Sequence, residues 1–395
     1  MGAMKGSALV ARDYRTGRRV RLVWRAGVIR EVTPEPGAGR GDPWVAPALV
    51  DLQVNGFAGT DFRADSVSEA DLARAIAGLH RSGCTRFLLT LFTEDWKTLL
   101  GRLRRFRALR KHAPSFLRAV VGWHIEGPFL SAAPGFRGAH PAEAMRDPSL
   151  EAIRELRRCA GPGPILLTLA PERRGAIAAI REAVALGMRV SLGHTDASAA
   201  CLEAAAAAGA TGFTHLGNGC PPALDRHDNI LWRILERTDL TVSLIPDQVH
   251  VSPPLFRIIH RLLPPDRIIY VSDAMAGAGS GPGVYRLGSL ELAVGRDQRV
   301  RLPGTQLYAG SALRPVDGVE RAVAMLGDAV RAERRAGDGA PWAAAWDRFS
   351  TLPAAWMGLP STLSPGAPAD FCVIQTNRDG TIRTLQVWSG GQETE

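Results

Sequence analysis

The 395-residue sequence lacks the features expected of a secreted or membrane-bound protein. No apolar run reaches the roughly 20 residues that a membrane-spanning helix needs. Residues Met1 to Gly6 lack the hydrophobic core of a signal peptide. The five cysteines are odd in number, widely spaced and without a Cys-x-x-Cys pair, which argues against a disulfide framework. We therefore predict a reduced, cytoplasmic protein with no membrane partner.

Lysine is also scarce and occurs only at positions 5, 97 and 111. The net charge of +9 therefore comes almost entirely from arginines scattered along the chain. Arginine clusters at 102–107 and 331–335 fall at helical spacing, which is typical of solvated helix faces. This distribution predicts a general attraction to anionic small molecules but no nucleic-acid partner.

Several nucleotide and nucleophile motifs are missing as well. There is no Walker A sequence and no Gly-x-Ser-x-Gly elbow. The glycine-rich stretch 276–283 does not read G-x-G-x-x-G, and no helix is predicted after it, so it does not predict a dinucleotide site. We interpret it as a mobile loop beside the functional site.

What the chain does contain is an alternation of short apolar runs with longer helical stretches. Eight candidate strands are expected at 48–54, 85–91, 119–125, 164–169, 189–192, 211–214, 241–245 and 267–272. The expected helices include 68–81, 95–112, 174–186, 197–209 and 254–263, followed by 316–336 and 342–357. Eight strands alternating with helices predict an α/β fold, a (β/α)8 TIM-like barrel.

The two ends of the chain have a different texture, with short β segments separated by turns. They lie at 8–11, 20–24 and 28–32, and again at 370–374 and 382–388. The last two flank Asn377-Arg-Asp-Gly380, which is a hairpin signal. We predict that residues 1–46 and 361–395 pair into a small β-sandwich domain, and that residues 47–360 form the barrel.

Polar residues fall where predicted barrel strands end. His194 and His215 end two consecutive strands, and a barrel directs such ends to one active face. Glu126 and Asp273 end two other strands. Taken singly, the histidines could be hydrogen-bonded residues near a loop, and either carboxylate could cap a turn.

Together these residues indicate more specific chemistry. One carboxylate and two imidazoles form the ligand set of a hydrolytic zinc site that keeps one position open. A metal there would lower the pKa of its water toward neutrality and polarise a carbonyl. Asp273 could then move the proton of the water to a leaving group.

A series of short segments is spread along the predicted barrel: Val50-Asp-Leu-Gln-Val-Asn-Gly-Phe57, His124-Ile-Glu-Gly-Pro-Phe-Leu130, Gly138-Ala-His140, Thr168-Leu-Ala-Pro-Glu172, Gly193-His-Thr-Asp196, Thr214-His-Leu216, Ser272-Asp-Ala-Met275 and Ala309-Gly-Ser311. With these segments, in this order, the sequence resembles the amidohydrolase superfamily and, within it, the N-acetylglucosamine-6-phosphate deacetylases. The terminal segments, including Pro365-Gly-Ala-Pro-Ala-Asp370, resemble its split sandwich.

The resemblance implies a role for each matching residue. Glu126, His194 and His215 would be metal ligands, and Asp273 would be the catalytic acid and base. His140 would lie beside the substrate amide and polarise its carbonyl. The sugar phosphate would be contacted by Asn218, the backbone of Gly219, His250 and Arg226. In the family, the arginine corresponding to Arg226 reaches into the neighbouring subunit's site, which implies a homodimer.

Many amidohydrolases carry His-x-His on the first strand and bind two metals. Here the corresponding residues are Gln53 and Asn55, whose amides are poor zinc ligands and are instead expected to contact substrate. None of the three lysines lies at a strand end, so a carboxylated lysine bridge is not expected either. The resemblance therefore implies one divalent ion per subunit, with Zn²⁺ expected and Fe²⁺, Co²⁺ or Mn²⁺ compatible with the same ligands.

Three departures from the family surround the expected phosphate site. Leu216-Gly-Asn-Gly-Cys220 replaces Leu-Phe-Asn-Ala-Met, Arg226-His-Asp-Asn229 replaces Arg-Glu-Pro-Gly, and Asp247-Gln-Val-His250 carries a bulky Gln248 in place of a glycine. The expected reaction is hydrolysis of N-acetylglucosamine 6-phosphate to glucosamine 6-phosphate and acetate. Alternatives are another N-acetyl amino sugar, phosphorylated or not, a larger sugar conjugate, a cyclic amide or an N-acyl amino acid. A non-enzymatic barrel would be expected to have lost Glu126, His194, His215 or Asp273, and all four are present.

Overall fold

The computed structural model describes residues 7–37, 41–288, 290–303, 308, 310–327 and 339–394. Three sequence features lie outside this range, namely the arginine cluster at 331–335, the end of the predicted helix 316–336, and Ala309. None of the described helices is long and apolar enough to span a membrane.

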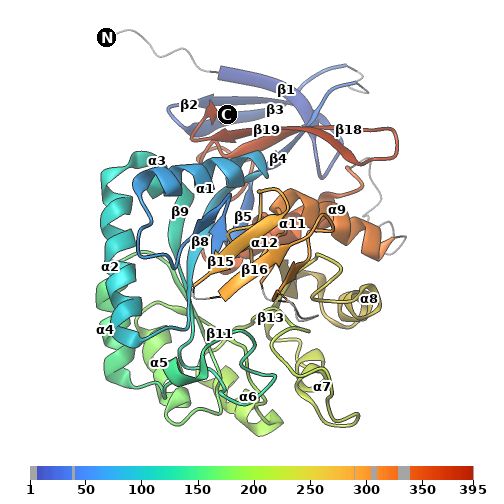
Figure 1. Cartoon of the computed structure of the whole chain (residues 1–395). Helices are drawn as coiled ribbons and strands as arrows, with labels where there is room; N and C mark the ends of the chain where they lie inside the picture. Colours follow the sequence, from blue (N-terminus) through green and yellow to red (C-terminus); the bar gives the residue numbers. More distant parts are fainter. Residues whose placement is uncertain are drawn as a thin grey trace.

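Eight parallel strands form the central barrel (Figure 1). In spatial order they are β5 (Leu49–Val54), β8 (Cys84–Phe92), β9 (Val120–Glu126), β10 (Ile165–Leu169), β11 (Arg189–Leu192), β12 (Gly212–Phe213), β13 (Thr241–Leu244) and β14 (Ile268–Tyr270). The gap between β14 and β5 is bridged just beyond both strands, where Asn55 N donates to Ala274 O at 2.8 Å. The predicted barrel is confirmed. Its strands are nearly all buried, because helices cover them outside and side chains fill the interior.

Helices surround the barrel (Figure 1). They are α1 (Glu69–Arg81), α2 (Trp96–His112), α3 (Pro114–Ala119), α4 (Leu150–Ala160), α5 (Ala176–Ala185), α6 (Ala199–Ala207), α7 (Ile230–Leu235), α8 (Pro253–Leu262), α9 (Pro315–Leu326), α11 (Ala343–Phe349) and α12 (Thr351–Trp356), with the short 3-10 turns Ala142–Ala144 and Pro265–Arg267. Side-chain caps set several starts: Ser68 forms a capping box with Asp71, and Ser198 accepts from Cys201 N.

One predicted helix is wrong in extent. The stretch 342–357 is two short helices, α11 and α12, which meet at Ser350 with φ −132° and ψ −81°. Pro353 explains the break, because in a continuous helix its ring would clash with the carbonyl of Phe349 four residues earlier. In the first turn of a new helix the proline is tolerated.

Strands from both ends of the chain form one mixed sheet beside the barrel, shown in blue and red in Figure 1. Its order is β20 (Gln392–Glu393), β19 (Ile382–Ser389), β18 (Phe371–Thr376), β4 (Trp44–Pro47), β1 (Ser7–Asp13), β2 (Arg19–Arg25) and β3 (Val28–Pro34). Trp24 of β2 packs edge-on against Phe371 of β18, with ring centroids 5.0 Å apart. The sheet therefore curls around an apolar core of its own.

A second small sheet was not predicted. It consists of β15 (Gly283–Leu287), β16 (Leu290–Val294) and β17 (Val300–Arg301), inserted between the barrel and α9. A two-stranded hairpin, β6 (Gly56–Phe57) and β7 (Thr60–Asp61), lies after β5. The glycine-rich stretch leading to β15 begins in a packed state, since Ala276 and Ala278 are buried and accept hydrogen bonds from Gly59 N and Ala58 N.

Candidate active site

The carboxyl ends of four barrel strands bring together the four side chains that the sequence singled out. Glu126 is the last residue of β9, and His194, His215 and Asp273 lie just after β11, β12 and β14. All four are buried, with exposed fractions between 2% and 9%. His194, His215 and Asp273 have positive φ values of 51°, 34° and 50°. Left-handed backbone at three non-glycine residues is strain of the kind that folds retain at functional sites.

The Glu126 carboxylate is the centre of the cluster. His215 Nε2 lies 2.9 Å and His194 Nε2 3.4 Å from its Oε1 atom, whereas His140 Nε2 lies 3.8 Å from Oε2. The rings of His140 and His194 are 4.4 Å apart, and those of His194 and His215 are 4.9 Å apart. Three imidazoles therefore face one buried carboxylate.

The donor set fits a metal ion. Ligand atoms of Glu126, His140 and His194 all lie within 4.8 Å of one another. Phe136 O accepts a hydrogen bond from His194 Nδ1 at 2.7 Å, so the Nε2 lone pair of a neutral ring faces the carboxylate oxygen. Two electron-rich atoms so close together are stabilised by a cation between them, and a backbone carbonyl on the far nitrogen is the usual support of a ligating histidine.

Two contacts in this cluster escaped sequence reasoning. Thr93 Oγ1 lies 2.8 Å from His140 Nδ1, and the carbonyl of Phe136 orients His194. Thr93 directly follows β8 and is completely buried, so a polar residue at the end of the second barrel strand was the available signal. The Phe136 carbonyl had no signal, because any residue carries one.

Gln53 and Asn55 are engaged with the two carboxylates. Gln53 Nε2 donates to Glu126 Oε1 at 3.1 Å, and Asn55 Nδ2 donates to Asp273 Oδ1 at 2.7 Å. Oδ1 of Asn55 is buried and has no hydrogen-bond partner among the described residues. Substrate contact by these amides stays a prediction, and their observed effect is to orient the two carboxylates.

The electrostatics of the site shift the pKa values of the two carboxylates in opposite directions. Burial raises the pKa of Asp273 to about 6, and the negative charge of Glu126 adds to the increase. Burial alone would also raise the pKa of Glu126, but the contacts with His194 and His215 lower it below its ordinary value. Burial lowers the pKa of His140, and His194 beside it lowers that pKa further. Glu126 is thus a permanent anion, while Asp273 titrates near the pH at which a proton carrier works best.

The residues predicted to hold the sugar phosphate lie on two loops. Asn218 and Gly219 follow His215, and a Cβ atom at Gly219 would lie only 3.0 Å from His194 Nδ1, so this loop lies directly against the cluster. His250 Nδ1 is 2.6 Å from Asp247 Oδ2, which raises the pKa of His250 against the effect of burial. Arg226 is exposed on the loop before α7.

Two of the departures from the family pattern lie in turns held by side-chain hydrogen bonds. Gln248, which stands where the family pattern has glycine, has φ +67°, a left-handed conformation that glycine adopts more readily than glutamine. Asp247 supports the turn by accepting from the backbone N–H groups of Val249 and His250, each at 2.9 Å. Asn229 caps α7 by accepting from Leu231 N and Trp232 N, which gives that substitution a structural role.

Gln248→Gly should stabilise the protein. A left-handed conformation costs an L-residue about 1–2 kcal/mol, and the greater freedom of glycine in the unfolded chain offsets part of the gain. We expect the free energy of unfolding to rise by roughly 0.5–1 kcal/mol in a urea titration. Gln248→Ala is the matched control, because it removes the same side chain but keeps Cβ. Equal stability of the two variants would contradict the strain argument.

Several known proteins that share one name resemble this chain over most of its length. The chain is 31% identical over 361 residues to the N-acetylglucosamine-6-phosphate deacetylase of Danio rerio, covering 87% of this chain and 84% of that protein. It is 30% identical over 279 residues to the Bacillus subtilis (strain 168) protein of the same name, covering 70% and 69%. The crystal structure of N-acetyl-D-glucosamine-6-phosphate deacetylase from Mycobacterium smegmatis superposes with a TM-score of 0.84 at 30% identity, covering 98% of this chain and 100% of that one. A mutant of that enzyme in complex with N-acetyl-D-glucosamine-6-phosphate gives a TM-score of 0.83. No family model matches the chain.

The parallel barrel, with a carboxylate and imidazoles gathered at its strand ends, defines an amidohydrolase. The relatives narrow this class, because their identity to the chain extends over most of the barrel and both ends. The chain belongs to the N-acetylglucosamine-6-phosphate deacetylase family. The resemblance expected from the sequence motifs is confirmed.

Proposed function

We propose that this protein hydrolyses the N-acetyl amide of N-acetylglucosamine 6-phosphate to glucosamine 6-phosphate and acetate. The observation that carries the proposal is the buried Glu126 carboxylate, faced by three histidine Nε2 atoms at 2.9–3.8 Å, with Asp273 as a second carboxylate at the same strand ends. A solved relative bound to N-acetyl-D-glucosamine-6-phosphate supports this substrate.

Glu126, His194 and His215 are our assignment for the ligands of one divalent ion, and Zn²⁺ is the ion that suits them. In support, His194 and His215 converge on the same carboxylate oxygen, Oε1, whereas His140 faces Oε2. When bound, the ion would supply a Lewis acid for the amide carbonyl and for water.

Asp273 carries the proton in this proposal. Its carboxylate accepts a proton from the attacking water and gives it to the nitrogen of the departing amine. Asn55 holds Oδ1 at 2.7 Å, which leaves Oδ2 for this exchange. A pKa raised to about 6 suits both steps, because the group can accept the proton and also release it near neutral pH.

His140 stabilises the negative charge that develops on the amide oxygen. Thr93 Oγ1 is closer to His140 Nδ1, at 2.8 Å, than to the carbonyl of Glu126, at 3.3 Å. For His140 to donate to the amide oxygen, its ring hydrogen must be on Nε2, with Nδ1 accepting from the Thr93 hydroxyl in place of the 3.3 Å bond from that hydroxyl to Glu126 O. Because its pKa is lowered, the ring acts as a neutral donor.

The phosphate is recognised by Asn218, the backbone of Gly219, His250 and Arg226. The raised pKa of His250, due to Asp247, favours a charged imidazole, which suits a phosphate ligand. Arg226 offers an exposed bidentate guanidinium. We assign it to the site of a second subunit, so that the functional unit is a homodimer.

The direct test is acetate release by metal-replete protein from N-acetylglucosamine 6-phosphate, N-acetylglucosamine and N-acetylgalactosamine 6-phosphate. We expect turnover of the glucosamine phosphate, with kcat/KM at least a hundredfold below it for the unphosphorylated sugar. Preference for the unphosphorylated sugar would overturn phosphate recognition, and no turnover of any of the three would overturn the proposed substrate class.

The pH dependence follows from Asp273. As a base it must be ionised, and its raised pKa means that it becomes protonated below about pH 6 rather than below about pH 4. We expect kcat to fall about tenfold per pH unit on the acid side of 6. The substrate phosphate also titrates near pH 6, so kcat at saturating substrate is the quantity to measure. A flat kcat down to pH 4.5 would contradict this role.

A further inference from the structure

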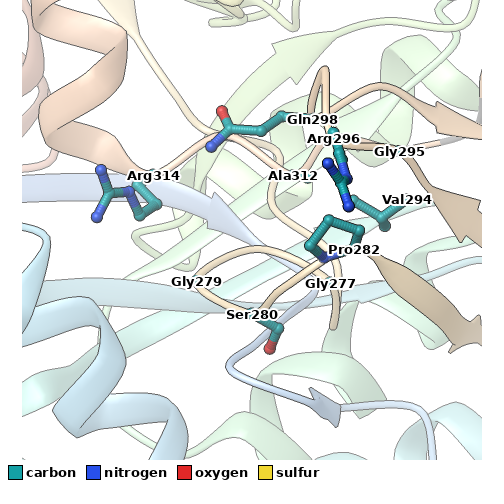
Figure 2. A pocket seen from close by; sticks show the side chains of 10 residues that line it. All are labelled: Gly277, Gly279, Ser280, Pro282, Val294, Gly295, Arg296, Gln298, Ala312 and Arg314. Carbon is teal, nitrogen blue, oxygen red and sulfur yellow. The ribbon is translucent and has the colours of Figure 1, made fainter.

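A cavity of about 240 Å³ lies beside the loop that follows Asp273 and is not part of the site described above (Figure 2). Three segments line it: the glycine-rich loop within 277–282, the end of β16 with the turn that follows it, and the two residues Ala312 and Arg314 before α9. The cavity is large enough for a small polyatomic ligand, because a water molecule takes about 30 Å³.

The charge of the lining has one sign. Arg296 and Arg314 line the cavity, and no carboxylate is among its lining residues. Arg296 is exposed, and its guanidinium has no ion-pair partner among the described residues. Arg314 uses Nε and Nη2 for Asp317, at 2.7 and 2.6 Å, which leaves Nη1 for another ligand. In the view of Figure 2, Arg296 lies above Pro282, and Gln298 and Arg314 lie to the left of both.

Gln298 adds an oriented donor. Its Oε1 accepts a hydrogen bond from Arg321, so the NH₂ end of the amide is the end left to bind a ligand. The residue has φ +57°, an unfavourable conformation for glutamine. Ser280 contributes a hydroxyl from the opposite loop. Two guanidinium groups and an amide NH₂ are hydrogen-bond donors, and donors of this kind recognise oxyanions.

We propose that this cavity is a second anion-binding site, which takes a phosphate group. Arg296 supplies the unpaired charge, and Arg314 and Gln298 supply further donors. The phosphate could be free inorganic phosphate or a second phosphate on a longer amino-sugar substrate, and both present the same oxygens to these residues.

The cavity is structurally connected to the active site on two sides. Gly277 lies four residues after Asp273 on a buried stretch of chain. Arg321, which binds Gln298, also donates through Nη1 to Asp247 O at 3.3 Å, and Asp247 holds His250. A ligand that fixes Gln298 therefore acts on the backbone next to the predicted sugar-phosphate contacts.

The binding test uses inorganic phosphate as the probe. Calorimetric titration of the metal-replete protein should show phosphate binding that Arg296→Gln weakens at least tenfold. Arg299→Gln is the matched control, because Arg299 lies on the same turn and is 44% exposed but does not line the cavity. Equal binding by Arg296→Gln and the unmodified protein would overturn the site. An equal loss in Arg299→Gln would also overturn it, because that would reflect general surface charge.

A kinetic arm separates the two sources and, unlike the titration, rests on the proposed function. It compares N-acetylglucosamine 6-phosphate with the 1,6-bisphosphate. If the second phosphate belongs to substrate, Arg296→Gln raises KM at least fivefold for the bisphosphate only. If the site instead takes free inorganic phosphate, added phosphate changes kcat for N-acetylglucosamine 6-phosphate in the unmodified protein and in Arg299→Gln. It does not change kcat in Arg296→Gln. Failure of all turnover with phosphate binding intact would count against the proposed function and leave the anion site standing.

Discussion

Asp273→Asn is expected to lower kcat by at least three orders of magnitude while leaving the protein folded and loaded with metal. Asparagine has the same size, so Asn55 can still donate to its Oδ1, as it does at 2.7 Å in the native site. An amide cannot take a proton from water, however, and a positioned general base contributes about 10²–10⁴-fold to the rate. Loss of the same group as the acid for the departing amine deepens the defect. Acetate release and metal content per subunit are the measurements.

The matched control for this variant is Asp51→Asn. Asp51 is also a fully buried carboxylate, and it accepts hydrogen bonds from Ser272 N, adjacent to Asp273. Burial raises its pKa to about 7, so it is about half protonated near neutral pH and an amide resembles its neutral form. We expect this control to keep kcat within about tenfold. Asp273→Asn with near-normal turnover would contradict the proposed proton carrier.

The barrel could be predicted because its sequence signal is repeated eight times. Each strand is an apolar run covered on both faces, and each polar strand end points to the same rim. Glu126, His194, His215 and Asp273 were accessible from this pattern alone. His140 was not, because it lies on a loop after β9, and only the resemblance to the family singled it out.

The inserted sheet β15–β17 shows where pattern reasoning stops. Its strands are only partly buried. Along β16 the burial of the five residues is, in order, intermediate, exposed, buried, intermediate and buried. They follow a stretch rich in glycine and proline, so the local sequence favours a loop. The strands are stabilised by contacts distant in sequence, such as Leu292 and Val294 packing with Met275 and Ala312. The broken helix at Ser350 is different, because Pro353 was visible and its effect on residue 349 could have been predicted.

Gln248 illustrates how far the conformation of a loop at the functional site can be predicted from sequence. The sequence shows a bulky residue where the family has glycine, which suggests an altered loop. In the structure Gln248 has left-handed backbone, and Asp247 accepts from the N–H groups of Val249 and His250. Asp247 thus supports the backbone that carries His250, and Gln248 adds an exposed side chain in a strained conformation.

Two histidine substitutions should distinguish a ligand of the metal from a histidine that only lies beside it. We expect His215→Asn to lose bound metal and at least 10³-fold in kcat, whereas His140→Asn should keep about one metal per subunit and still lose activity. The reason is geometric, since His215 and His194 share Oε1 of Glu126 and His140 lies beside Oε2. Removing a ligand leaves only two protein donors, too few for a stable site.

Thermal unfolding gives an independent reading of the same difference. A metal that binds only the folded protein stabilises it by RT ln(1 + [metal]/Kd), about 4 kcal/mol when the free metal is a thousandfold above Kd. Added zinc should therefore raise the Tm of the unmodified protein and of His140→Asn by several degrees, and leave His215→Asn nearly unchanged. The reverse pattern, with metal lost in His140→Asn and kept in His215→Asn, would exchange the two roles. It would make Glu126, His140 and His194, whose ligand atoms lie within 4.8 Å of one another, the ligand set.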